Sequence, residues 1–210
     1  MCTSFRVTAT DGAVVVGRTM EFPNAMATKL TVLPRAYRGT GIGQHGSGMK
    51  WTSAYGVVGM DAFGQPGTMT DAMNERGLYA GLLYMPGFCE YTPAEDQDPA
   101  SLMSIVDTVA YVLGVSATVE EATAAMSPGH RVAVHLRPVR LRSPGGLRRE
   151  PPSRGHRRGD GGNSMAQLRY IVRTYDNPVP QLIELGHVDF SAPGPREAAL
   201  PHHAFAPLAV

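Results

Sequence analysis

The pattern of apolar and polar positions predicts a chain built from many short strands. Two β-rich runs, residues 3–10 and 13–20, flank Asp11-Gly12, and an Asp-Gly pair in this setting is typical of a β-hairpin. Residues 39–48 are rich in glycine and are expected to form a loop. Further strands are expected over residues 29–33, 55–60, 68–73 and 78–84, with turns at residues 65–67 and 74–77. The last of these strands is apolar with little alternation, which is typical of a strand buried on both faces.

Two helices are expected after residue 97. Asp98 and Pro99 suit the N-cap and first turn of the first helix. Apolar residues then recur at helical spacing on one face: Leu102, Ile105, Val106, Val109 and Leu113. Thr118-Val119-Glu120-Glu121 has the pattern of a capping box and predicts a second helix that reaches about Met126. Both patterns indicate packing elements and suggest no chemistry.

Length and composition indicate one globular unit. The chain has 210 residues, of which 43% are apolar, and this is enough to bury one sizeable core. It has no apolar run of about 18 residues or more, so no membrane partner is expected. It also has no charged segment followed by an apolar run at its start, so no secretory signal is expected. Two cysteines do not make a disulfide framework, and the protein is expected to be cytoplasmic with reduced thiols.

The composition changes abruptly at residue 128. Residues 128–162 hold nine arginines but only Glu150 and Asp160 as acidic residues, a local net charge of +7 in a chain whose total is +1. Prolines and glycines crowd the same stretch, so it is expected to be disordered or loop-like. Strand character returns at residues 167–175. The chain is therefore divided into a core (1–127), an irregular arginine-rich segment (128–165), and a short strand with an irregular tail (166–210).

This arginine-rich segment has three interpretations. It can be a flexible linker, or a basic patch for nucleic acid or anionic lipid. No aromatic residue interleaves the arginines and no nucleic-acid-binding fold surrounds them, so no nucleic-acid partner is expected. The third interpretation is out-of-frame translation of GC-rich coding DNA, which also enriches arginine, proline, glycine and serine.

The candidate chemistry lies at the start of the chain. Removal of Met1 would leave Cys2 with a thiol nucleophile and a free α-amine, whose ordinary pKa of roughly 7.7–8.0 suits a general base. The predicted hairpin returns Arg18 and Glu21 to the level of Cys2. Arg18 would favour the thiolate, and Glu21 would orient the ammonium form of the amine. The alternative is that Arg18 and Glu21 are an ordinary solvated pair at a strand end.

Four motifs carry a resemblance to a known family. They are Met1-Cys2-Thr3-Ser4, Gly17-Arg18-Thr19-Met20-Glu21, Asp71-Ala72-Met73-Asn74-Glu75-Arg76-Gly77-Leu78, and Gly81-Leu82-Leu83-Tyr84-Met85-Pro86-Gly87. Residues 1–127 thereby resemble the choloylglycine hydrolase family, the conjugated bile salt hydrolases and penicillin V acylases, which are N-terminal nucleophile hydrolases. The resemblance implies an α+β fold, an αββα sandwich that is incomplete here, in which the two predicted helices cover one face of a sheet.

The resemblance also implies an activity, hydrolysis of a non-peptide linear amide through Cys2. Arg18 and Glu21 would assist as described, and the backbone N–H of Tyr84 would stabilise the oxyanion. A tyrosine at this position resembles penicillin V acylases more than bile salt hydrolases. The expected partner is a small N-acyl amide, such as a conjugated bile salt, penicillin V or an acyl-homoserine lactone. No metal and no cofactor are implied, and a homo-oligomer stays open.

The later part of the chain departs from the family pattern. Where the family has a Thr-Asn element that completes the oxyanion hole, this chain has Gln181-Leu182-Ile183-Glu184-Leu185-Gly186. A later arginine of the family has no counterpart that can be assigned. The alternative function is therefore a truncated or frame-disrupted inactive relative, at most a binding remnant.

Glu21 yields a first prediction, because the family usually has an aspartate there. Glutamate adds one methylene, which carries the carboxylate farther from the backbone. If the Glu21 carboxylate orients the Cys2 amine, Glu21→Asp will preserve or raise the rate of N-acyl amide hydrolysis. Complete loss of hydrolysis in Glu21→Asp, with the protein still folded, would contradict this role.

Overall fold

The structure is a computed structural model that describes residues 2–20, 27–43, 46–83, 91, 93–95, 97–127, 133–135, 153–155, 168–174 and 179–198. The expected domain limits near residues 128 and 166 fall at or beside the gaps between these ranges, so that division stays a prediction. No helix among the described residues has the length and apolar character needed to cross a membrane.

The described residues are mainly strands with two α-helices and several 3-10 turns. The strands are β1 (Thr3–Thr8), β2 (Val14–Thr19), β3 (Leu30–Leu33), β4 (Arg38–Gly43), β5 (Gly46–Thr52), β6 (Val57–Ala62), β7 (Gln65–Asn74), β8 (Tyr79–Gly81), β9 (Leu102–Ser104), β10 (Ala133–His135), β11 (Ser153–Gly155), β12 (Arg169–Val172), β13 (Gln181–Glu184) and β14 (Arg196–Ala198). The helices are α1 (Thr108–Val115) and α2 (Val119–Met126), with 3-10 turns η1 (Pro99–Ser101), η2 (Ile105–Asp107) and η4 (Leu185–His187).

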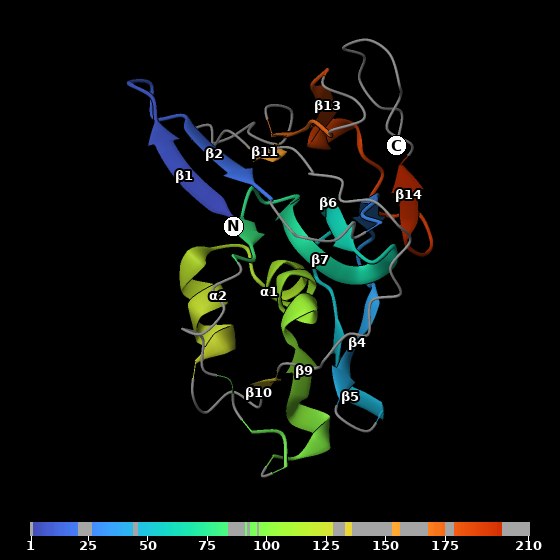
Figure 1. Cartoon of the computed structure of the whole chain (residues 1–210). Helices are drawn as coiled ribbons and strands as arrows, with labels where there is room; N and C mark the ends of the chain where they lie inside the picture. The colour runs from blue at the N-terminus through green and yellow to red at the C-terminus, as the bar shows by residue number, and fades with distance from the viewer. Residues whose placement is uncertain are drawn as a thin grey trace.

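Two five-stranded sheets form the body of the molecule (Figure 1). The first sheet has the order β1-β2-β11-β12-β13, and the second has the order β14-β3-β6-β7-β8. One core cluster lies between the sheets and contains Val58, Met73 and Tyr170, while a second cluster packs Val57 and Ala72 against Leu113 of α1. Neighbouring residues of β6 thus enter different clusters, which shows that the second sheet is buried on both faces.

This layering is the expected αββα arrangement in incomplete form. Helices α1 and α2 cover the second sheet on the side away from the first sheet. Within the described ranges no α-helix covers the outer side of β1, where Phe5 and Val7 are exposed. The described residues therefore form a two-sheet sandwich with one helical layer.

The opening hairpin is confirmed. Strands β1 and β2 pair antiparallel in a register that places Thr3 opposite Thr19 and Ser4 opposite Arg18. Asp11 accepts a hydrogen bond from the Ala13 N–H through its carboxylate, and Gly12 adopts a positive φ of 82°. A left-handed residue after an aspartate is the local geometry that the Asp-Gly pair predicts.

The prediction of a loop at residues 39–48 is wrong, because strands β4 and β5 form a hairpin in this region. Its glycines allow close packing that a side chain would block. A Cβ on Gly39 would lie 2.1 Å from the Trp51 ring, and a Cβ on Gly48 would lie 2.0 Å from the Leu102 carbonyl oxygen. Tertiary contacts therefore explain the glycines here, although glycine usually indicates irregular chain.

The expected first helix begins later than predicted. Asp98 does cap a turn, since its carboxylate accepts from the Ala100 N–H, but that turn is the short η1. Leu102 then lies in strand β9, and α1 starts only at Thr108. The carboxylate of Asp107 accepts from the Ser104 and Ile42 N–H groups, which holds the extended stretch against β4 before the helix starts.

The second helix, α2, is confirmed from Val119 to Met126. Thr118 caps it by accepting from the Glu121 N–H, while the Glu121 carboxylate reaches the N–H of Ala117. The predicted strand near residue 170 is also confirmed as β12. At β10 and β11 the backbone is extended and paired, which differs from the irregular chain expected there. The rest of the arginine-rich segment lies outside the described residues, and its expected disorder stays a prediction.

Two strand limits differ from the sequence pattern. The turn expected at residues 65–67 lies earlier, at Phe63 and Gly64, whose φ values of 64° and 62° suit a two-residue hairpin loop. Strand β8 was expected to be buried on both faces, but Tyr79, Ala80 and Gly81 are only half-buried. The reason is that β8 is the last strand of its sheet within the described residues.

The turn after β7 is anchored by Asn74, which is fully buried. Its side-chain amide donates to the carbonyls of Leu113 and Ser116 at 2.9 and 2.7 Å, so it caps the C-terminal end of α1. Its Oδ1 accepts from the N–H groups of Arg76 and Leu78, each at 3.0 Å. One side chain therefore satisfies four backbone groups and fixes the helix on the sheet.

Asn74→Asp should destabilise the protein by at least about 2 kcal/mol, because a carboxylate oxygen would replace two buried donors and face two carbonyls. Urea unfolding followed by circular dichroism measures this loss. Arg76→Ala in the same turn is the matched control, since Arg76 is exposed, and should stay within about 0.5 kcal/mol. Equal midpoints for wild type and Asn74→Asp would contradict the anchoring role.

Candidate active site

Cys2 and Arg18 meet across the opening hairpin. Because Ser4 lies opposite Arg18, Cys2 is the diagonal neighbour of Arg18 on the same face of the sheet. Arg18 Nη2 donates to Cys2 Sγ at 3.7 Å, and Cys2 is half-buried. The expectation that the hairpin brings Arg18 to the thiol therefore agrees with the structure. The alternative that Arg18 is solvated at a strand end is wrong, because Arg18 is only 2% exposed.

The Arg18 guanidinium is held by backbone carbonyls of the second sheet. Nη1 donates to the Thr70 carbonyl at 2.6 Å, and Nη2 donates to the Leu82 carbonyl at 2.7 Å. Thr70 is the extra residue of a β-bulge, because Met60 pairs with Asp71 and Asp61 pairs with Met69. The bulge and the residue after β8 thus supply acceptors for the two Nη groups of this buried cation.

A buried acidic residue, Asp71, completes the cluster. Its carboxylate lies 3.7 Å from Arg18 Nη1, and both side chains are 2% exposed. The Tyr170 hydroxyl donates to Asp71 Oδ1 at 2.6 Å, and the Tyr79 hydroxyl donates to Oδ2 at 3.4 Å. Burial raises the pKa of both tyrosines, and the negative charge of Asp71 raises it further, so both hydroxyls keep their protons at neutral pH.

Sequence reasoning did not select Asp71, Tyr79 or Tyr170 as site residues. Asp71 opens one of the motifs that carry the family resemblance, and this was the available signal. Tyr170 is 99 residues away from Asp71 in the chain, and nothing local connects the two.

The other expected site residues, Glu21 and Tyr84, lie outside the described residues, as does Cys89. The structure does describe Leu82 and Leu83, which directly precede Tyr84. Arg18 Nη2 donates to the Leu82 carbonyl as well as to Cys2 Sγ. The roles of Glu21 and Tyr84 stay predictions.

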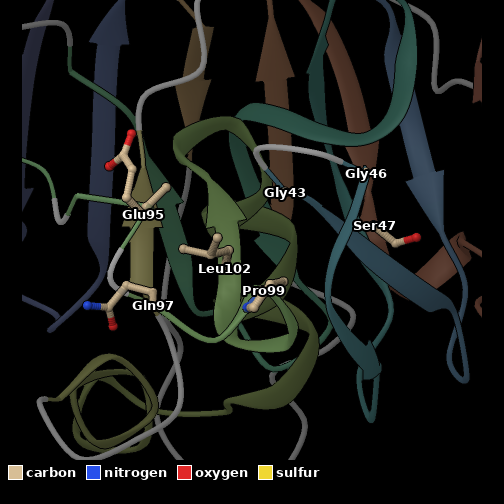
Figure 2. A pocket seen from close by; sticks show the side chains of 8 residues that line it. Gly43, Gly46, Ser47, Glu95, Gln97, Pro99 and Leu102 are labelled. Atoms are coloured by element: carbon tan, nitrogen blue, oxygen red, sulfur yellow. The ribbon is translucent and has the colours of Figure 1, made fainter.

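No group of three or more histidine, cysteine, aspartate or glutamate side chains lies close enough to hold a metal ion in the part of the chain that the structure describes. A cavity of about 390 Å³ lies where the β4–β5 hairpin end faces Pro99 and Leu102, with Glu95 and Gln97 on its other side (Figure 2). An open apolar groove of about 510 Å³ lies between β8 and the helices α1 and α2. Neither is lined by Cys2, Arg18 or Asp71.

Three solved structures similar to this one have chains of about twice its length. Penicillin V acylase from Agrobacterium tumefaciens matches with 22% identity and a TM-score of 0.55, over 87% of this chain and 49% of that one. The C2A variant of conjugated bile acid hydrolase from Clostridium perfringens matches with 19% identity and a TM-score of 0.54, over 87% and 50%. The R18L variant of the same hydrolase matches with 17% identity and a TM-score of 0.52, over 86% and 50%.

This chain thus spans about half the length of the solved chains, and at these identities the likeness shows the shared fold. No curated protein matches the sequence. The model of the linear amide C–N hydrolases, choloylglycine hydrolase family, matches residues 2–142. That match covers more than half of the chain and includes the hairpin, Arg18 and Asp71. The chain belongs to the choloylglycine hydrolase family of linear amide C–N hydrolases.

Proposed function

We propose that this protein hydrolyses a linear amide with Cys2 as an N-terminal nucleophile. The observation that carries the proposal is the buried guanidinium of Arg18, whose Nη2 donates to the half-buried Sγ of Cys2 at 3.7 Å. A cation at this distance favours the thiolate, which is the reactive form of cysteine. In support, the two similar bile acid hydrolase structures are variants at a cysteine in position 2 and an arginine in position 18.

The first half of the reaction forms an acyl-enzyme. The Cys2 amine takes the thiol proton, and Sγ attacks the amide carbonyl carbon, so a C–S bond forms and the carbonyl oxygen becomes an oxyanion. The Tyr84 N–H is proposed to donate to this oxyanion, and the loss of one such donor typically costs about 10²–10³ in rate. The intermediate then collapses, the C–N bond breaks, and the ammonium of Cys2 returns the proton to the leaving amine.

The second half regenerates the enzyme. The Cys2 amine removes a proton from water, whose oxygen attacks the thioester carbon. The C–S bond breaks, the carboxylic acid leaves, and the ammonium returns its proton to the Cys2 thiolate, which restores Cys2 for another cycle. Glu21 is proposed to orient the amine in both halves through a charge-assisted hydrogen bond.

The proposed substrates are small N-acyl amides, represented by a conjugated bile salt, penicillin V and an acyl-homoserine lactone. All three join an amide to a bulky or apolar acyl group. The two enzymes named in the similar structures, penicillin V acylase and conjugated bile acid hydrolase, support a panel built around these compounds.

The nucleophile gives a direct prediction. Intact-mass spectrometry should show loss of Met1, because the proposed base exists only once Cys2 is N-terminal. Cys2→Ala should abolish hydrolysis of every compound that the wild type cleaves, since no other group would then form the acyl-enzyme.

Cys89→Ala is the matched control, because it removes the other thiol of the chain, and it should leave hydrolysis unchanged. Activity that survives Cys2→Ala would refute the mechanism. A wild type without activity, whose Cys2 reacts with iodoacetamide no faster than Cys89, would instead favour the inactive relative.

The role of Arg18 can be tested without turnover. Arg18→Gln should raise the pH midpoint of Cys2 alkylation by iodoacetamide by about one unit or more, because the neutral amide no longer stabilises the thiolate. Hydrolysis near neutral pH should fall at least about tenfold, as the thiolate fraction falls tenfold per unit.

Arg6→Gln is the matched control, since Arg6 lies exposed on the neighbouring strand β1 and should leave the midpoint unchanged. Circular dichroism verifies that both variants are folded. A folded Arg18→Gln protein with the wild-type midpoint would show that Arg18 does not act on the thiol.

A further inference from the structure

A chain of buried polar groups leads from the space between the two sheets to Cys2. Tyr170 on β12 and Arg18 on β2 belong to the first sheet, whereas Asp71 on β7 belongs to the second. Tyr170 donates to Asp71 at 2.6 Å, Asp71 lies 3.7 Å from Arg18, and Arg18 donates to Cys2 Sγ at 3.7 Å. Arg18 thus links Asp71 and Tyr170 to the thiol.

The cluster is an unusual component of a core. Tyr170 is fully buried among apolar residues such as Met73, Leu168 and Ile183. A buried ion pair is often no more stabilising than apolar residues of the same volume, because each charge loses its hydration. Stability alone therefore does not explain why Arg18 and Asp71 are paired in the core. The contact of Arg18 with the Cys2 thiol suggests that the pair acts on the thiol.

The geometry of the guanidinium makes its two ends interdependent. A guanidinium is planar and presents its donors in a rigid fork. Nη1 contacts the Thr70 carbonyl and Asp71, and Nη2 contacts the Leu82 carbonyl and Cys2. A shift at the Nη1 side therefore rotates or translates Nη2 relative to Sγ, so the position of the Asp71 carboxylate decides how the cation faces the thiol.

The Asp71 carboxylate is itself oriented by Tyr170. The 2.6 Å bond occupies Oδ1 and leaves Oδ2 facing Arg18 Nη1 and the Tyr79 hydroxyl. Tyr79 is the weaker donor, at 3.4 Å. The pKa of Tyr170 is raised by burial and by the charge of Asp71, so this hydroxyl stays a donor throughout the pH range in which a cysteine titrates.

We propose that Asp71 and Tyr170 are positioning residues that hold the Arg18 guanidinium toward the Cys2 thiol. This inference deepens the proposed function, on which it rests for the use of the thiol, and it assigns the two residues no contact with substrate. The charged and titratable groups that face Arg18 within the described residues include Cys2 beside β1, Asp71 from β7, Tyr79 from β8 and Tyr170 from β12.

Tyr170→Phe tests the proposal, because it removes the donor to Asp71 without a change of charge and with little change of volume. The pH midpoint of Cys2 alkylation by iodoacetamide should rise by about 0.5 unit or more. The kcat for the cleaved amide should fall at least about threefold with KM within about twofold, since only the reacting group is disturbed.

A double-mutant cycle shows whether Tyr170 acts through Arg18. In the Arg18→Gln background, Tyr170→Phe should cause no further shift of the alkylation midpoint. Tyr111→Phe is the matched control, because Tyr111 is also buried but belongs to the cluster at α1. It should leave the midpoint unchanged even if it lowers the unfolding temperature.

Two results would overturn the inference. One is a folded Tyr170→Phe protein with the wild-type midpoint, whatever its unfolding temperature, since a purely structural role would then suffice. The other is an equal shift with and without Arg18. If Tyr170→Phe does not fold, Asp71→Glu replaces it, because it keeps the charge but moves the carboxylate, and the same two results apply.

The alkylation assay also separates this inference from the proposed function. In one outcome the wild type cleaves no amide, but Tyr170→Phe still shifts the alkylation midpoint and this shift disappears in the Arg18→Gln background. That outcome would keep the positioning role and refute amide hydrolysis. In the opposite outcome, amide hydrolysis depends on Cys2 but Tyr170→Phe leaves the alkylation midpoint unchanged. That outcome would keep amide hydrolysis and refute the positioning role.

Discussion

The buried guanidinium of Arg18 joins the two sheets at the point where Cys2 lies. A cation with 2% exposure has lost its hydration, so its donors need acceptors from the protein. The Thr70 carbonyl, at the bulge of β7, and the Leu82 carbonyl, directly after β8, accept from its two Nη groups. The first sheet therefore carries the cation beside the Cys2 thiol, and the second sheet fixes the direction in which the cation points.

The bulge at Thr70 determines which side chains of β7 lie on each face of the second sheet. In a regular strand, residues two apart share a face. Met69 and Ala72 are three apart, yet both pack in the cluster under α1, because the extra residue resets the alternation. Asp71 consequently faces the first sheet, where it meets Tyr170 and Arg18. One backbone irregularity thus supports the helical layer and also places the carboxylate of the site.

Much of the fold follows from short-range signals, and the exceptions have a common cause. The β1–β2 hairpin and helix α2 were predictable because Asp11-Gly12 and Thr118 act on groups a few residues away. The β4–β5 hairpin and the late start of α1 were not, because their backbone is decided by contacts between distant segments. Gly39 leaves room for Trp51, and Asp107 binds the N–H of Ile42, 65 residues earlier.

The candidate site divides in the same way. The sequence alone determined that Cys2 and Arg18 are neighbours, since the register of a hairpin is fixed by its turn and by strand alternation. Only the tertiary structure decided that Arg18 is buried, that Asp71 lies next to it, and that Tyr170, 99 residues from Asp71, donates to Asp71. The physical reason is that their contact depends on which faces of two sheets pack together. No local pattern of hydrophobic and polar residues specifies that choice.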